Sequence, residues 1–169
     1  MSWLLEDETR LAMQAAVDKG TLPTAEQQTE FEAAVRGSDS LMSVAGTSAE
    51  IRVEGVLTQK PDLFARWFGG GNTTYGEIVQ ALAEAEADPN VQDITLAIDS
   101  PGGQFAGLFD ALAAISATKK PTYAKVHGMA ASAAYAIASQ ADSITAMGRA
   151  SQVGSIGVVA SFYVDDRVV

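Results

Sequence analysis

From residue 50 onwards, short apolar runs alternate with Ala-rich segments that have helical periodicity. Strands are expected over residues 51–57, 94–98, 122–126 and 143–146, and helices over 74–87, from the turn at 100–103 to about 117, and over 131–140. The run at 94–98 is apolar enough for a strand that is buried on both faces. Strands that alternate with helices at this spacing predict βαβ crossovers, so the expected fold class is α/β.

The N-terminal part of the chain follows a different pattern. Residues 5–19 and 24–36 are predicted to be helical, and Thr24 and Gln27 are spaced as a capping box at the start of the second segment. A linker of small residues follows at 37–48. We therefore expect a helical prefix and linker over residues 1–47 and an α/β domain over residues 48–169.

Composition and charge narrow the class of protein. The 169 residues are 47% hydrophobic and 19% charged, as is typical of a globular chain. The net charge of -10 disfavours a nucleic-acid binder, which needs a basic face. Zero cysteines and one histidine leave little material for a metal site, so we expect no metal and no cofactor. The longest apolar stretches, 129–138 and 156–164, are too short to span a membrane, and the first residues do not have the pattern of an export signal. A cytoplasmic protein is therefore expected.

Two turns carry the candidate chemistry, and each follows a predicted strand and leads into a predicted helix. The first turn is Asp99-Ser-Pro-Gly-Gly103, and the second turn runs from His127 to Ser132. Ligands of open α/β sheets collect at the carboxyl ends of strands, and consecutive glycines allow backbone amides to face a cavity. Taken alone, a serine such as Ser132 is more often a helix N-cap, and Pro-Gly-Gly is usually only a turn. Asp99 is expected to orient the first turn through an Asx-type hydrogen bond rather than to act as an acid or base.

The two turns together are more specific than either alone. Asp-Ser-Pro-Gly-Gly, a separation of 29 residues from Gly103 to Ser132, and Met-Ala-Ala-Ser resemble the signal peptide peptidase A family of serine peptidases. That family shares its fold with the Clp protease and the crotonases, so the resemblance implies a Clp protease/crotonase-like spiral of repeated β-α-β units. The nucleophile of the family falls on Ser132, and its oxyanion donors fall on the backbone amides of Gly103 and Ala133. Where the family commonly has Gly-Gly after the serine, this chain has Ala133-Ala134, a mild departure that keeps both amides.

The general base is not evident in the sequence. Clp proteases have a histidine in a stretch similar to residues 151–155, and this chain has Ile156 and no histidine there. The signal peptide peptidase family uses a lysine that lies further beyond the serine, whereas no lysine follows Lys125 here. Residues 164–169 resemble the start of the family's next helix, so the domain is expected to be truncated at its C-terminus. Lys125 is expected to be an ordinary strand lysine and His127 a structural or substrate-facing residue, and Lys119 and Lys120 are expected to be solvated.

The resemblance implies a serine endopeptidase with a Ser-Lys dyad that cleaves extended polypeptides and forms a homo-oligomeric ring. The chain is most similar to the soluble phage and prophage proteases that cut scaffold and portal proteins during capsid assembly, in the cytoplasm of a bacterial host. The loop at 63–71, with aromatic residues followed by glycines, and the helical prefix are similar to that branch. The alternatives are a signal-peptide-degrading peptidase and a non-catalytic fragment or assembly subunit that keeps the fold. A crotonase-type acyl-CoA enzyme is disfavoured, because residues 127–142 contain no glutamate and the chain is acidic.

Overall fold

The computed structural model describes residues 41–62 and 71–159, together with positions 11, 14–16, 18–20 and 24. Most of the expected helical prefix and linker, and nearly all of the loop at 63–71, therefore lie outside the described residues. The division of the chain at residue 47 stays a prediction. Within the described residues, no helix is both long enough and apolar enough to cross a membrane.

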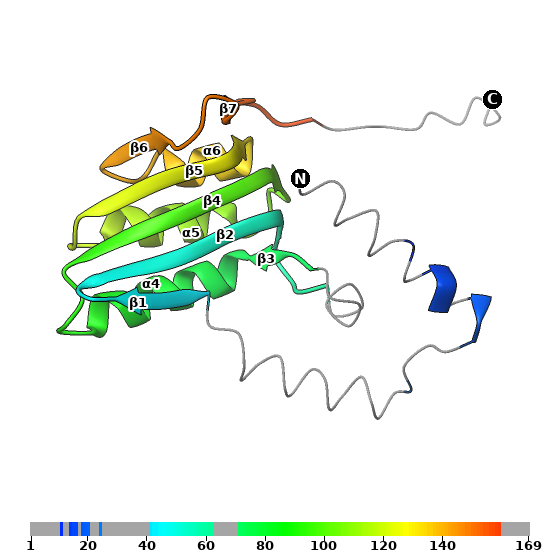
Figure 1. Cartoon of the computed structure of the whole chain (residues 1–169), viewed down its shortest axis with the longest axis horizontal. Coiled ribbons are helices and arrows are strands. Elements are labelled where there is room, and N and C mark those ends of the chain that lie inside the picture. Colours follow the sequence, from blue (N-terminus) through cyan, green and yellow to red (C-terminus); the bar gives the residue numbers. More distant parts are fainter. Residues whose placement is uncertain are drawn as a thin grey trace, which may run out of the picture.

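The described part of the chain is built on a single mixed sheet (Figure 1). Its strands run in the order β1-β2-β4-β5-β6, with β3 paired to β2 and β7 paired to β5. The strands are β1 (Met42–Ala45), β2 (Ser48–Thr58), β3 (Thr73–Thr74), β4 (Asp93–Gly103), β5 (Thr122–Ala131), β6 (Ser143–Ala146) and β7 (Gln152–Gly154). Among these, β1 pairs antiparallel with β2 and every other pairing is parallel, so the α/β class predicted from the sequence is confirmed.

Three helices connect the parallel strands and lie on the same face of the sheet (Figure 1). They are α4 (Tyr75–Ala87), α5 (Leu108–Ala117) and α6 (Ala133–Ala138). The start of α4 has the capping box that its sequence predicts: the Glu77 amide donates to the Thr74 hydroxyl at 3.2 Å, and the Thr74 amide donates to the Glu77 carboxylate at 2.9 Å. Helix α6 is shorter than expected, because β5 continues through the second turn as far as Ala131.

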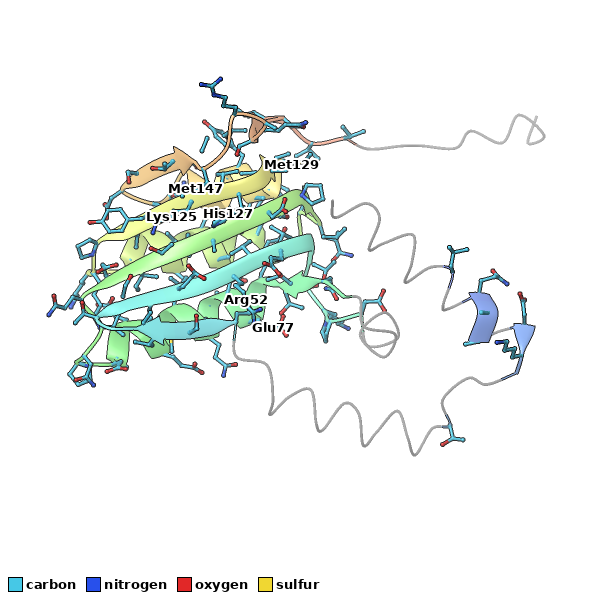
Figure 2. The ribbon with its side chains drawn as sticks, viewed as in Figure 1. Arg52, Glu77, Lys125, His127, Met129 and Met147 are labelled. Carbon is cyan, nitrogen blue, oxygen red and sulfur yellow. The ribbon has the colours of Figure 1, made fainter. Side chains whose placement is uncertain are left out.

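Burial follows the pattern of a sheet covered by helices on one face. In β4, all five residues at 94–98 are buried, as predicted for a central strand. In β2, by contrast, buried and exposed residues alternate, which leaves Glu50, Arg52 and Glu54 on the face that the three helices do not cover. Lys125 and His127 lie on β5 (Figure 2), where His127 is exposed and Lys125 is half-buried.

Lys120 is not solvated, and the expectation for this residue was wrong. Its ammonium group donates hydrogen bonds of 2.7 Å to the carbonyls of Ala85 and Asp88 at the C-terminal end of α4. The last carbonyls of a helix lack partners within the helix and carry partial negative charge, so a cation is favoured there. The side chain of Lys120 thus joins the loop before β5 to the end of α4.

Regular pairing breaks at the same level in three neighbouring strands. The register shifts in β2 between Glu54 and Val56, where Gly55 has φ +67°. It shifts again between Ile98 and Ser100 of β4, which pair with Val126 and Ala130 of β5. Each break lies near the carboxyl end of its strand, at the edge of the sheet where both candidate turns are found.

Candidate active site

The first turn is held from inside by Ser100, a residue that the sequence analysis did not single out. Its side chain is fully buried. The hydroxyl donates to the Gly55 carbonyl at 2.6 Å and accepts the Gly102 amide at 3.1 Å. Ser100 therefore joins the break in β2 to the glycines of the first turn. The burial of its side chain indicates this role, and burial is known only from the fold.

The two glycines of the first turn are required for different reasons. Gly102 has φ +92°, and a Cβ atom there would lie 2.6 Å from the Ala131 carbonyl oxygen and 2.8 Å from both the Ala133 nitrogen and the Ser132 Cβ. A Cβ atom on Gly103 would collide with the backbone of Leu57 on β2. Gly102 is therefore packed against the second turn, whereas Gly103 is packed against β2.

A buried tyrosine holds the end of the first turn. The Tyr75 hydroxyl donates to the Gln104 carbonyl, and the Gln104 amide donates to the Leu57 carbonyl at 2.8 Å. Burial raises the pKa of Tyr75 to about 12, so its hydroxyl keeps the proton that it donates across the whole neutral range. Both ends of the turn are thus tied to neighbouring elements.

Ser132 has a backbone conformation that is unusual for a residue with a side chain. Its φ is +54° and its ψ is -121°, and its side chain makes no capping hydrogen bond to α6. Ser132 therefore stands at the N-cap position of α6, but its side chain does not cap the helix. The Ser132 amide donates to the Gly154 carbonyl of β7 at 3.0 Å, and the Ser132 carbonyl accepts the Ala136 amide at 3.0 Å. Conformations of this kind cost of order 1–3 kcal/mol and cluster at functional sites, where the surrounding structure holds them.

The structure brings the predicted site residues to one place. Ser132 and Ala133 lie against Gly102, and Gly103 is the next residue of the same turn. Gly102 is buried, whereas Gly103 is exposed to solvent. The arrangement consists of a strained serine beside a glycine turn, with backbone amides on both sides, at the carboxyl edge of a parallel sheet.

Asp99 acts on the second turn, which corrects the expectation that it orients the first. Its carboxylate oxygen Oδ1 accepts the Met129 amide at 3.0 Å. A Cβ atom on Gly128 would lie within 2.8 Å of the other carboxylate oxygen, so only glycine leaves room for this contact. The side chain of Asp99 therefore fills the break in pairing between β4 and β5.

In the described part of the chain, no hydrogen bond joins Lys125 or His127 to Ser132. Lys125 pairs with Ala97 of β4 and Ala130 pairs with Ser100 of β4, so three residues of β4, about 10 Å at the usual rise per residue, separate these two positions. Ser132 lies two residues further on, whereas proton transfer needs hydrogen-bond reach. His127 is exposed on the same strand (Figure 2). Among the described residues, no group of three or more His, Cys, Asp or Glu side chains is arranged to hold a metal ion.

A cavity of about 460 Å³ opens next to the end of the first turn. It is formed where β2 and β4 end, and its lining is mixed polar and apolar. The lining residues are Thr58, Gln59, Lys60, Pro61, Asp62 and Gln104. Gln104 links the cavity to the turn, because its side-chain oxygen accepts the Gln59 amide at 3.1 Å.

The fold and the two turns define an α/β protein that presents a strained serine against a glycine turn. Residues 114–166 match the model of peptidase family S49, and this match includes Ser132. The chain is 36% identical over 153 residues to the head-tail preconnector protein GP5 of Enterobacteria phage P21, an alignment that covers 83% of this chain and 30% of that protein. It is 38% identical over 91 residues to the capsid assembly protease C of Escherichia phage lambda, covering 53% of this chain and 20% of the protease. The resemblance to this peptidase family is therefore confirmed, and two of the proteins that the chain is similar to come from phages.

A further relative and a solved structure are also similar to this chain. Protease 4 of Salmonella typhi is 38% identical over 92 residues, covering 53% of this chain and 14% of that protein. The chain thus spans less than a third of the length of each of these curated relatives. An enoyl-CoA hydratase/isomerase family member is similar in structure, with a TM-score of 0.47 and 19% identity over 61% of this chain and 45% of that one. This last likeness concerns the fold class alone.

Proposed function

We propose that this chain carries the nucleophile and the oxyanion hole of a serine endopeptidase that processes head proteins during phage capsid maturation. The observation that carries the proposal is the strained Ser132, packed against Gly102 at the edge of the sheet. The similarity to a capsid assembly protease supports the choice of substrate class, because that relative acts in head assembly by its name. The proposed substrates are scaffold and portal polypeptides in an infected or lysogenic bacterial cell.

In the proposed reaction, the Ser132 hydroxyl oxygen attacks the carbonyl carbon of the scissile peptide bond while a general base accepts the hydroxyl proton. The negative charge that develops on the carbonyl oxygen is stabilised by the amides of Gly103 and Ala133. The C–N bond then breaks, the base returns the proton to the leaving amine, and a water molecule hydrolyses the acyl-serine. A preorganised pair of amides is expected to contribute a large share of the rate enhancement.

The proposed base is a lysine, which acts with Ser132 as a dyad. A lysine amine accepts a proton at neutral pH only where desolvation lowers its pKa. Lys125 makes no hydrogen bond to Ser132 and lies before the bulge of β5, so we propose that the lysine is contributed by a part of the protein beyond these residues or by a neighbouring subunit of a ring. The alternative is a non-catalytic assembly subunit, and it is favoured by the absence, among the described residues, of a hydrogen bond between Ser132 and a candidate base.

The cavity beside the first turn supports a peptide substrate. Extended peptides bind to such enzymes by pairing with an exposed strand edge, while pockets hold alternate side chains. The cavity lies next to Gln104, which directly follows Gly103 in sequence.

The test is labelling by a fluorophosphonate, followed by intact mass. We expect one adduct on a form of the protein that includes the base lysine, no adduct on its Ser132→Ala variant, and an unchanged adduct on Ser143→Ala, a matched control at an exposed serine of β6. An adduct that persists in Ser132→Ala would refute the assignment of the nucleophile. If neither the 169-residue chain nor a longer form is labelled, the assembly-subunit alternative is correct.

A further inference from the structure

The break in pairing between β4 and β5 places an acidic side chain where a strand amide would otherwise have no acceptor. β4 advances by two residues from Ile98 to Ser100, while β5 advances by four from Val126 to Ala130. The extra residues of β5 form a bulge, and a bulge leaves backbone groups unpaired. The Asp99 carboxylate accepts the Met129 amide at 3.0 Å within this bulge.

The contact requires a side chain of this length with an oxygen acceptor, opposite a glycine. A Cβ atom on Gly128 would lie 2.7 Å from the Asp99 Cγ and 2.8 Å from Oδ2, closer than van der Waals contact permits. Gly128 has no positive φ that would require glycine for conformational reasons, so the space for the carboxylate is what a larger residue would remove. The Asp99 carboxylate and the missing side chain of Gly128 are thus both needed for this one hydrogen bond.

The position of the bulge determines where β5 resumes its pairing. After Met129, Ala130 pairs with Ser100 of β4, and Ala131 pairs with Gly154 of β7. The next residue is Ser132, whose amide donates to the same Gly154. Gly102 is packed closely against Ser132, so a small displacement of β5 changes the distance between Ser132 and the first turn.

We propose that Asp99 is a positioning residue. By accepting the Met129 amide in the bulge of β5, it fixes the position of Ser132 relative to the first turn. The expected effect of Asp99 on the reactivity of Ser132 rests on the proposed function. Its effect on the position of the second turn does not depend on that function. A hydrogen bond to a charged acceptor is stronger than one between neutral groups. Asp99 acts through the backbone and does not exchange protons with the substrate.

The test compares three variants by amide exchange and by the rate of fluorophosphonate labelling. Asp99→Ala removes the acceptor, Asp99→Asn keeps an oxygen in the same place, and Gly128→Ala displaces the carboxylate while Asp99 remains. We expect Asp99→Ala and Gly128→Ala to speed exchange of the Met129 amide and to slow labelling of Ser132, each by about tenfold or more. Asp99→Asn is expected to stay within about threefold of wild type in both.

A glycine-to-alanine control separates the effect of the contact from that of the substitution itself. Gly76 lies in α4, where a Cβ atom would have nothing within 4 Å, so Gly76→Ala should leave both readouts unchanged. If Asp99→Ala does not fold, Gly128→Ala decides the question with the carboxylate present. Unchanged exchange at Met129 overturns the proposal, and so does faster exchange with unchanged labelling, which would make Asp99 only structural.

The proposed function and this inference fail in distinguishable ways. If the wild-type protein, in a form that includes the base lysine, is not labelled, the proposed function is wrong. The effect of Asp99 is then measured at the Ser132 amide, which donates to Gly154. Faster exchange of that amide in Asp99→Ala and Gly128→Ala supports positioning of the turn, whereas unchanged exchange overturns it.

Discussion

Replacing Ser100 with alanine is the perturbation with the clearest expected magnitude. The substitution removes one hydroxyl from a fully buried position and leaves the Gly55 carbonyl and the Gly102 amide without that partner. A buried polar group that loses its partner costs about 1–3 kcal/mol. Because Gly102 is buried and Gly55 is only half-buried, we expect Ser100→Ala to lower the free energy of unfolding by about 2–4 kcal/mol. For a chain of this size, that corresponds to a fall in Tm of roughly 5–15 °C.

The same substitution should slow labelling of Ser132, because the first turn loses its link to β2. Removal of one oxyanion donor costs about a hundredfold or more in other enzymes, and displacement of a donor is a milder change. We therefore expect labelling to slow by at least about tenfold in Ser100→Ala. The slowing should exceed the loss of folded protein, which is measured in the same sample by circular dichroism.

The matched control is Ser116→Ala, which removes one exposed hydroxyl that donates to Gln140 at 2.7 Å. An exposed substitution of this kind is expected to change stability by less than about 0.5 kcal/mol. Urea unfolding of the three proteins gives the comparison directly. A Ser100→Ala protein that unfolds at the same urea concentration as Ser116→Ala would refute the reasoning, since the buried hydroxyl would then contribute nothing.

Three further predictions concern the surroundings of the site. Gly102→Ala should slow labelling of Ser132 by more than about tenfold, because its methyl group would collide with the second turn; Gly76→Ala is its control. Lys120→Met should lower the free energy of unfolding by about 1–2 kcal/mol in urea titrations, since the carbonyls at the end of α4 lose a charged donor. Because burial raises the pKa of Tyr75 from 10.0 to about 12, the folded state retains a proton that the unfolded chain releases. The free energy of unfolding should therefore fall as the pH rises from 10 to 12. In urea titrations at about pH 8 and about pH 11, the decrease between the two pH values should be smaller for Tyr75→Phe than for wild type.

Periodicity was sufficient to predict the three helices and the strands β2, β4, β5 and β6 of the described domain. It did not predict β3, β7 or β1, and β1 (Met42–Ala45) falls within the expected linker at 37–48. The helix of residues 75–87 begins at its capping box, and β4 is buried along residues 94–98, both as predicted. The second turn was misjudged in one respect, since β5 runs through it to Ala131. Propensity does not report a bulge of this kind, which is determined by pairing with strands distant in sequence.

The candidate site was predictable only where its residue types are unusual. Consecutive glycines and a serine among alanines indicate the two turns, and the structure brings Gly102 and Ser132 together. Ser100 and Asp99 were harder to assign, because a serine and an aspartate beside Pro-Gly-Gly are equally typical of an ordinary turn. Their partners, at Gly55 and Met129, lie 45 and 30 residues away in sequence. The same holds for Lys120, whose acceptors depend on where α4 ends.

The breaks in the sheet and the proposed chemistry have a common physical origin. In regular parallel pairing, the amides of an interior strand donate to its neighbours, and none is free to meet a substrate oxygen. Where β2, β4 and β5 change register together, backbone groups are released from that pattern. Buried groups among them need other partners, and Ser100 and Asp99 supply these for Gly102 and Met129. The exposed Gly103 follows directly after the break, so the irregularity that requires the two polar side chains also bears on the proposed oxyanion hole at this edge of the sheet.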